Sequence, residues 1–304
     1  MPEMEATGGE RSRKPRWAVW IFLVILFILT LTTGVALWIR SQPPEPSFQG
    51  KRLTEWLVDL DYSHRPPDVT ASNAVAQMGT NILPFLKPML RAHDSKLKVT
   101  MMDLLAKQSL VKIHFTRADQ RRESASCACR VLGPAALCYL PELTDMLDSR
   151  SRSTPWSGLV AIMGVAGRTN CAPELTKALT SPMAQTRWYA AMILGDEKAQ
   201  YKPAVTNLLR NLKDADPKVR RESAQALGKI RLNVPALIGP LIALLDDTNA
   251  AVRVESAIAL GRLTPDSQPA RTKLIQLRVD KDSNVQGAAL RALTLLDEKS
   301  NAGP

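Results

Sequence analysis

The chain has 304 residues, 45% of them hydrophobic, so it carries enough apolar surface to bury a core and is not predicted to be disordered. Forty Lys and Arg residues against 29 Asp and Glu residues give a net charge of +11, which favours acidic partners such as anionic lipids, nucleic acid or acidic proteins. Aromatic residues make up only 5% of the chain, and there are four Cys and three His residues. This composition argues against base stacking and leaves little material for metal chemistry.

The first segment that stands out is an apolar run at 17–39. It extends from Trp17 to Ile39 without a charged residue. As a helix it would be about 35 Å long, enough to cross a hydrocarbon core of about 30 Å. Tryptophans stand near both ends, where indole rings prefer the membrane interface. We therefore predict one transmembrane helix at 17–39.

The charges on either side of this segment predict its orientation. Four basic residues lie within 1–16, whereas Arg40 is the only basic residue just after the span, so the N-terminus should stay in the cytoplasm. Everything after the span would then be exported across the inner or cytoplasmic membrane, to a periplasmic or other extracytoplasmic location. A cleavable signal peptide is the alternative, although the apolar region of such peptides is usually only about 7–15 residues long. The Pro-rich stretch at 40–50 predicts a stiff spacer before a domain at 51–304.

A repeat of 33 residues organises the second half of the chain. Four related stretches begin at positions 186, 219, 252 and 285, and read "TRWYAAMILGDE", "VRRESAQALGKI", "VRVESAIALGRL" and "VQGAALRALTLL". Within one copy, Val219, Ser223, Leu227 and Ile230 are spaced as one face of a helix, and small residues recur at equivalent positions of the other copies. After three of the copies, a second apolar run begins with a proline. Proline is favoured at the first position of a helix, so it marks the start of a second helix. Each unit is therefore predicted to be two helices joined by a short turn.

The same markers extend the array towards the N-terminus. Gly133 and Gly164 continue the series at a spacing of 31, and the interval of 54 residues between Gly79 and Gly133 leaves room for one degenerate unit centred on 97–110. We therefore predict about seven helix pairs and a final half unit, preceded by an amphipathic capping helix in "KRLTEWLVDLDY". The stretch 107–120 breaks the register and has no assigned role.

Charged residues recur on the same register. The turn between units carries an aspartate at a spacing of 33, and a long polar residue follows it six positions later. We interpret these residues as structural, with each carboxylate tying the turn to the next helix. The members of this series are Asp214, Asp247 and Asp280, followed by Arg220, Arg253 and Gln286.

These units resemble HEAT repeats, in the short variety also called PBS-lyase type. The motif D-x-x-P-x-V-R-x-x-[SA]-A-x-A-L-G-x-[IL] carries the resemblance, which covers about 230 residues and is strongest at 183–297. The stretch "FQGKRLTEWL" (48–57) is similar to the lead-in of membrane-anchored bacterial HEAT-repeat proteins. The resemblance implies an all-α fold, an α-solenoid, in which the second helices line a concave surface that binds partners.

No constellation of catalytic residues is visible in the sequence. His64, His93 and His114 are isolated from one another, and there is no Gly-rich phosphate loop. We therefore predict a protein that is not an enzyme and has no metal, no cofactor and no small-molecule substrate. The four cysteines, interpreted as small hydrophobic residues with a Cys138–Cys171 disulfide as the alternative, are Cys127, Cys129, Cys138 and Cys171.

These observations favour a membrane-tethered, non-enzymatic protein–protein interaction scaffold of the cell envelope. Its partner is expected to be an envelope protein with an acidic segment, because basic residues recur on the second helices. These candidate binding residues are Lys87, Arg91, Arg210, Lys213, Arg271 and Lys273. Two alternatives remain: an enzyme of the bilin-lyase type, or a nucleic-acid-binding solenoid if the domain is cytoplasmic.

Overall fold

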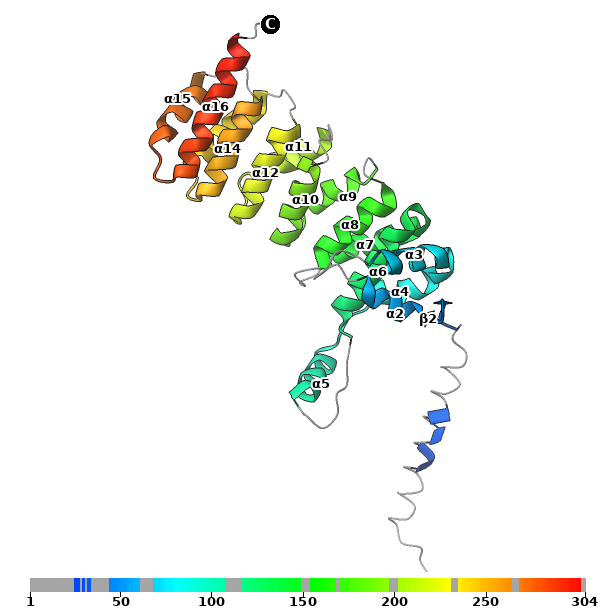
Figure 1. Cartoon of the computed structure of the whole chain (residues 1–304). Helices are drawn as coiled ribbons and strands as arrows, with labels where there is room; N and C mark the ends of the chain where they lie inside the picture. Colours follow the sequence, from blue (N-terminus) through cyan, green and yellow to red (C-terminus); the bar gives the residue numbers. More distant parts are fainter. Residues whose placement is uncertain are drawn as a thin grey trace, which may run out of the picture. The chain divides into compact units, whose positions relative to one another are not determined.

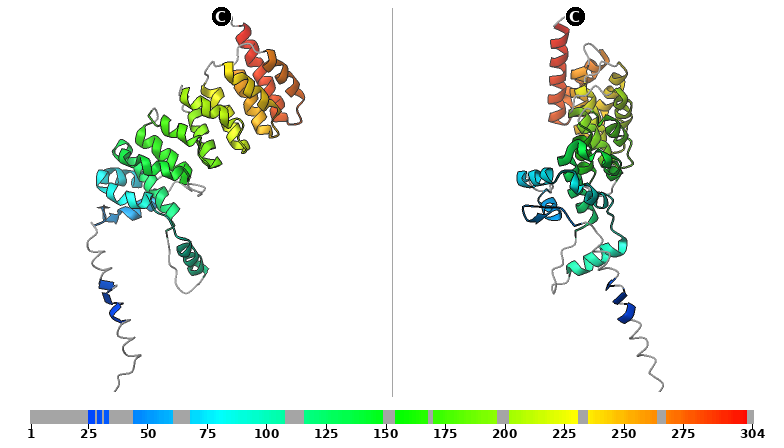
Figure 2. Two further views of the ribbon diagram at one scale, coloured as in Figure 1. Left: turned by 180° about the vertical axis from the view of Figure 1, so that it is seen from behind. Right: turned by 90° about the vertical axis from the view of Figure 1, so that its right-hand side faces the viewer.

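The structure is a computed structural model that describes residues 25–27, 29–30, 32–33, 44–60, 68–107, 116–148, 154–167, 170–196, 202–230, 235–263 and 268–301. The chain divides into two compact units, Met1–Glu45 and Pro46–Pro304. The second unit contains a two-stranded hairpin and a series of helices (Figures 1 and 2). Its strands and α-helices are β1 (Ser47–Phe48), β2 (Lys51–Arg52), α2 (Leu53–Asp59), α3 (Val69–Met78), α4 (Leu83–Leu90), α5 (Lys96–Lys107), α6 (Ala118–Leu132), α7 (Leu140–Asp145), α8 (Thr154–Ala166), α9 (Ala172–Ala178), α10 (Ala184–Asp196), α11 (Lys202–Asn211), α12 (Pro217–Ile230), α13 (Ile238–Ala243), α14 (Ala250–Leu263), α15 (Gln268–Gln276) and α16 (Ser283–Asn301). Short 3₁₀ turns flank several of them: η1 (Gly79–Ile82), η2 (Gly133–Tyr139), η3 (Met146–Asp148), η4 (Pro235–Leu237), η5 (Leu244–Asp246) and η6 (Leu277–Val279).

Of the first unit, residues 25–27, 29–30, 32–33 and 44–45 are described, and the backbone is helical at 25–27, 29–30 and 32–33. The hydroxyl of Thr30 donates a hydrogen bond to the Phe27 carbonyl at 2.9 Å, and that of Thr33 donates to the Leu29 carbonyl at 2.8 Å. Within the described ranges, no helix has both the length and the apolar character that crossing a membrane requires. The predicted span at 17–39 falls largely outside those ranges and stays a prediction.

The second unit begins with a tight β-hairpin at the end of the predicted spacer. Phe48 pairs with Lys51 across a two-residue turn, in which Gln49 and Gly50 have φ values of 51° and 76°. Positive φ at both positions is the geometry of the turns that join antiparallel strands closely. The indole N–H of Trp56 in α2 donates to the Phe48 carbonyl at 3.2 Å, which fixes the hairpin on the first buried helix. The predicted N-terminal capping helix is thereby confirmed.

Six helix pairs can be traced in the described part of the second unit. They are α3 with α4, α6 with α7, α8 with α9, α10 with α11, α12 with α13, and α14 with α15, after which α16 stands as a final half unit. The first helices α10, α12, α14 and α16 lie side by side in chain order (Figures 1 and 2). One continuous apolar core runs from Leu53 to Leu296. The predicted helical repeat fold is confirmed, and the units starting near 186, 219, 252 and 285 have the predicted register.

The degenerate unit predicted around 97–110 was wrong. The first helix of the next unit, α6, packs directly against α3 and α4, so no helix pair lies between them. Between α4 and α6, the described residues instead contain one helix, α5, which stands outside the row of paired helices (Figure 1). The long interval between Gly79 and Gly133 can arise from an inserted helix as well as from an additional repeat unit, so the spacing alone did not distinguish the two. The expected seven pairs are therefore six among the described residues.

Candidate partner-binding surface

A ladder of ion pairs links the turns of consecutive units. Arg187 Nε lies 2.7 Å from Asp214 Oδ2, and the Arg220–Asp247 pair has the same geometry at 2.8 Å. The next rung, Arg253–Asp280, measures 2.7 Å between Nη2 and Oδ1. The guanidinium forms two parallel bonds to the carboxylate in each rung, the strongest arrangement for this pair.

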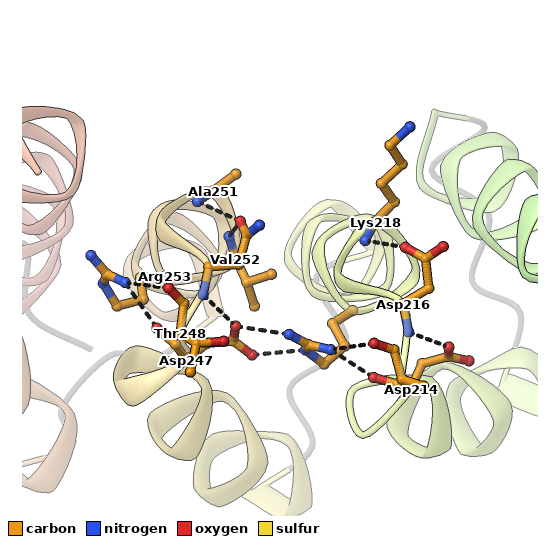
Figure 3. A network of polar contacts seen from close by, with 11 residues as sticks. Asp214, Asp216, Lys218, Asp247, Thr248, Ala251, Val252 and Arg253 are labelled. Carbon is orange, nitrogen blue, oxygen red and sulfur yellow. Dashed lines mark hydrogen bonds and ion pairs between the residues drawn. The ribbon is translucent and has the colours of Figure 1, made fainter.

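The ladder differs from the predicted pairing in one respect. Each aspartate accepts the ion pair from the arginine 27 residues earlier, in the preceding unit, and not from the arginine six residues later. The later arginine binds the backbone of the same turn, as Arg220 Nη1 does with the Asp214 carbonyl at 2.7 Å. Figure 3 shows two of these turns, around Asp214 and Asp247. Each arginine thus ties its own turn to the next one.

The carboxylates of the ladder are strongly held in their charged form. Burial alone would raise the pKa of Asp247, but hydrogen bonds from Arg220 and the Asn249 N–H hold this pKa below its ordinary value of 3.8. The pKa of Asp280 is also lowered, first by the hydrogen bond from Arg253. The side chains of this last pair are only 6% and 10% exposed, so the ladder is part of the interior.

Two members of the ladder were missed in the sequence. Arg187 forms the first rung, and its Nη1 donates to the Ser181 carbonyl at 2.8 Å. Ser181 stands 33 residues before Asp214, and its hydroxyl donates to Asp148 Oδ1 at 2.6 Å. The 33-residue register would have identified both positions, because Arg187 aligns with Arg220 and Ser181 aligns with Asp214.

A large hollow among the described residues lies on the first helices. It has a volume of about 880 Å³ and is lined by residues of α10, α12, α14 and α16 and of the turns before α14 and α16. Its lining carries charges of both signs and includes two ion pairs: Arg221–Glu222 within α12 at 2.5 Å, and Lys229–Asp196 between α12 and α10 at 2.6 Å. We call this hollow the charged groove.

A smaller, more apolar hollow adjoins the charged groove. It has a volume of about 320 Å³ and shares Met192 and Asp196 with the groove. We call it the Trp156 pocket, after the tryptophan of α8 whose side chain is 39% exposed. The residues lining it are Arg130, Trp156, Val160, Met163, Gly164, Met192, Ile193 and Asp196.

The sequence explains why the stack opens at the Trp156 pocket. In the three following contacts, a glycine of one first helix meets a small alanine of the next, as Gly228 meets Ala259. Between α8 and α10 the position equivalent to Ala259 is Ile193, and a side chain of this size does not permit the same backbone approach. Gly164 of α8 instead packs against Arg130 of the preceding first helix. The pocket is thus a local consequence of one bulky residue.

Aromatic residues, scarce in this chain, gather beside the Trp156 pocket. The ring centroids of Trp156 and Tyr189 are 5.0 Å apart, and those of Trp188 and Tyr189 are 3.7 Å apart. Lys218 Nζ lies 6.0 Å from the centroid of Trp188. Aromatic residues next to a pocket are typical of the energetic centre of protein interfaces.

The basic residues predicted to bind a partner are not gathered into one cluster. Four of them lie on the second helices, but two of these are neutralised, Arg271 by Asp297 at 2.6 Å and Lys273 by Asp246 at 2.7 Å. Arg91 pairs with Glu142 at 2.7 Å, and Lys87 is exposed on α4. Arg210 and Lys213 line a separate hollow of about 700 Å³ beside the first rung of the ladder. The binding of a partner by these six basic residues stays a prediction.

The structure gives no metal cluster of His, Cys, Asp and Glu side chains within the described ranges. All four cysteines, including Cys138 and Cys171, are free thiols, so the structure does not contain the alternative disulfide. Burial raises the pKa of the Cys129 thiol to about 12, which makes it inert as a nucleophile. His93 is exposed on the turn after α4, whereas His64 and His114 lie outside the described residues.

The sequence of this part of the chain matches a known family. A family model described as HEAT repeats matches residues 172–239 and 205–294. Residues 172–294 are thus similar to HEAT repeats. They include the charged groove, the ladder and the first helices α10, α12 and α14. The finer assignments, to the PBS-lyase variety and to a membrane-anchored bacterial type, stay predictions.

Engineered and designed proteins are among the solved structures to which the chain is similar. An engineered protein from the Northeast Structural Genomics Consortium is 18% identical, with a TM-score of 0.44, over 81% of this chain and 98% of its own. A designed armadillo repeat protein in complex with the peptide (KR)4 is 20% identical, with a TM-score of 0.41, over 58% of this chain and 93% of its own. No curated protein matches the chain.

Proposed function

We propose that this protein is a non-enzymatic scaffold, tethered to the inner or cytoplasmic membrane, that binds a segment of another envelope protein along its first helices. The observation that supports this most is the continuity of the Trp156 pocket with the charged groove. Their shared residues, Met192 and Asp196, make one extended surface with an apolar end and a charged end. A helical repeat fold presents such extended surfaces for protein partners.

The two ends suit different parts of one bound segment. An apolar or aromatic side chain of the partner would fill the Trp156 pocket, where burial contributes most to affinity. The polar part of the segment would lie along the charged groove, in which Arg221 and Lys229 face Glu222 and Asp196 in existing ion pairs. Because these charges already compensate each other, the groove favours a partner with charges of both signs. The acidic segment predicted from composition fits better at Arg210 and Lys213, which we retain as a second contact.

The membrane tether and the export of the repeat domain are part of this proposal. They rest on the charge-free run at 17–39 and on the basic residues within 1–16. A reporter fused after residue 304 tests them: a reporter active only outside the cytoplasm supports the orientation, and one active only in the cytoplasm contradicts it. The same experiment decides which compartment supplies the partner.

Site-specific photocrosslinking tests the binding surface. A photoreactive amino acid replaces Gln225 in the charged groove of the full chain in membranes, and the matched control carries it at Val279, which is 85% exposed. We expect one reproducible protein adduct at position 225 and not at position 279. The adduct should weaken in a Trp156→Ala background. Equal crosslinking at both positions, or an adduct indifferent to Trp156, would contradict the proposed surface.

A further inference from the structure

The helix α5 carries an apolar stripe that nothing in the described part of the protein covers. Leu97, Met101 and Leu104 are 72%, 53% and 62% exposed. Their spacing of four and three residues puts them on one side of the helix. Met102, on another side, is 7% exposed. The helix therefore has one apolar face that is buried and a second that is left open.

Basic residues border the open stripe. At 100° per residue, Lys98 falls on one side of the stripe and Lys96 falls on the other. The stretch 96–117 contains five Lys and Arg residues and a single acidic residue, Asp103. An apolar stripe between two basic borders is typical of a helix that lies in the interface of an anionic membrane. A protein partner of this stripe would need matching acidic residues on both sides of an apolar ridge.

The N-terminal end of α5 is held against α6, the first helix of the second helix pair. Asp94, just before α5, accepts hydrogen bonds from the Ala118 N–H at 2.7 Å and from Lys98 Nζ at 2.5 Å. Arg117 Nη2 also lies 3.1 Å from Asp103 Oδ1. These contacts join α5 to the start of α6, and α2, which follows the predicted spacer, packs against the same helix. Within the second unit, α5 is therefore attached at the end of the array where the chain arrives from the N-terminal segment.

We propose that α5 binds an anionic lipid surface, with Leu97, Met101 and Leu104 inserted between the lipids and the lysines at the headgroups. Burying the stripe gives an apolar contribution, and an anionic surface attracts the lysines. This membrane contact goes beyond the proposed function, since it is separate from both the partner surface and the span at 17–39. It holds the N-terminal units against the bilayer and leaves the first helices of the C-terminal units for a partner.

Hydrogen exchange of the full chain tests this contact. The protein is placed in lipid nanodiscs at one copy per disc, made of phosphatidylcholine alone or mixed with phosphatidylglycerol. We expect exchange of the amides in 96–107 to be slowed about tenfold or more only with the anionic lipid, and the protection to fall at high salt. Substituting Leu97→Ser, Met101→Ser and Leu104→Ser together should abolish it. Because all three side chains are exposed, the substitutions should leave the fold intact, and hydrogen exchange of the α12 amides should not change.

Matched controls separate this contact from a general effect of removing exposed apolar side chains. Val58→Ser and Val279→Ser remove apolar side chains that are 69% and 85% exposed elsewhere, and they should leave the protection of 96–107 intact. Protection that is equal in both kinds of disc, or absent from both, would overturn the proposal. Protection already present in detergent micelles would show that another copy or the chain itself covers the stripe, and would overturn it too. The Gln225 crosslink should persist in the triple variant, so failure of one proposal is distinguishable from failure of the other.

Discussion

Gly228 of α12 faces Ala259 of α14 so closely that a Cβ on Gly228 would lie 2.8 Å from the Ala259 Cα. The same relationship joins Gly195 to Ala226 and Gly261 to Ala292. None of these glycines has a positive φ, so each is required by the approach of two helices and not by a turn. The small residues of the repeat are thus fixed by contacts between units.

This geometry predicts that Gly228→Ala destabilises the protein although alanine is the better helix former. The added methyl must displace the α14 backbone, and overpacking of this kind costs about 1–3 kcal/mol, against a gain in helix propensity of about 1 kcal/mol. We expect a net loss of up to about 2 kcal/mol in the free energy of unfolding, measured by urea denaturation. Gly239→Ala in α13 is the control, because a methyl group at this position would meet no atom within 4 Å and the φ of Gly239 is not positive. Gly239→Ala should stabilise the protein slightly. Equal changes in the free energy of unfolding at positions 228 and 239 would contradict the close contact between α12 and α14 as the cause.

The ladder predicts a large difference between two neighbouring aspartates. Asp247→Asn leaves the guanidinium of Arg220 without its charged partner in a site where the side chains are 8% and 15% exposed. We expect a loss of about 3 kcal/mol in the free energy of unfolding. Asp246 pairs with Lys273 but is 63% exposed, so Asp246→Asn should cost less than about 1 kcal/mol. Thermal unfolding of the two variants distinguishes the buried pair from the surface pair.

The same carboxylates predict that stability falls in acid. The pKa values of Asp214, Asp247 and Asp280 are lowered from 3.8 in the folded state. The ladder therefore contributes its full stability above the unfolded pKa and loses it as the pH falls through the folded pKa values. We expect the melting temperature to drop steeply below about pH 4. The drop should be shallower in Asp247→Asn, and an unchanged slope in that variant would show that other groups control acid unfolding.

The 33-residue register predicted most of the fold, and there are physical reasons why it did not predict the rest. A spacing of 33 placed the first helices of the C-terminal units, because stacked units must reuse one contact face. It could not reveal that Asp247 binds Arg220, since the six-residue interval to Arg253 is closer in sequence while the ion pair forms between units. It also could not locate the charged groove or the Trp156 pocket. The second helices were chosen for their basic residues, but Asp246 and Asp297 neutralise two of these through contacts that only the fold creates.

Ile193 is the clearest case of a functional signal hidden in the repeat. It occupies a position where the other copies have alanine, and in the sequence it reads as one more apolar residue. In the structure it is 4% exposed and forms part of the wall of the Trp156 pocket. A deviation from the consensus at a buried contact position is therefore the feature that could have indicated the pocket.

Filling this pocket should block the partner without destabilising the fold. Val160 lines the pocket from α8 and is only partly buried, so Val160→Trp can place its ring in the existing space of about 320 Å³. We expect the adduct formed from position 225 to fall at least about fivefold, which corresponds to a loss of about 1 kcal/mol of binding free energy. Leu290→Trp on α16, where the native side chain is 47% exposed, is the matched control and should leave the adduct unchanged. Unchanged melting temperatures in both variants would attribute the difference to the pocket. If the Val160→Trp protein crosslinks as well as the native chain, the partner does not use the Trp156 pocket and binds the charged groove alone.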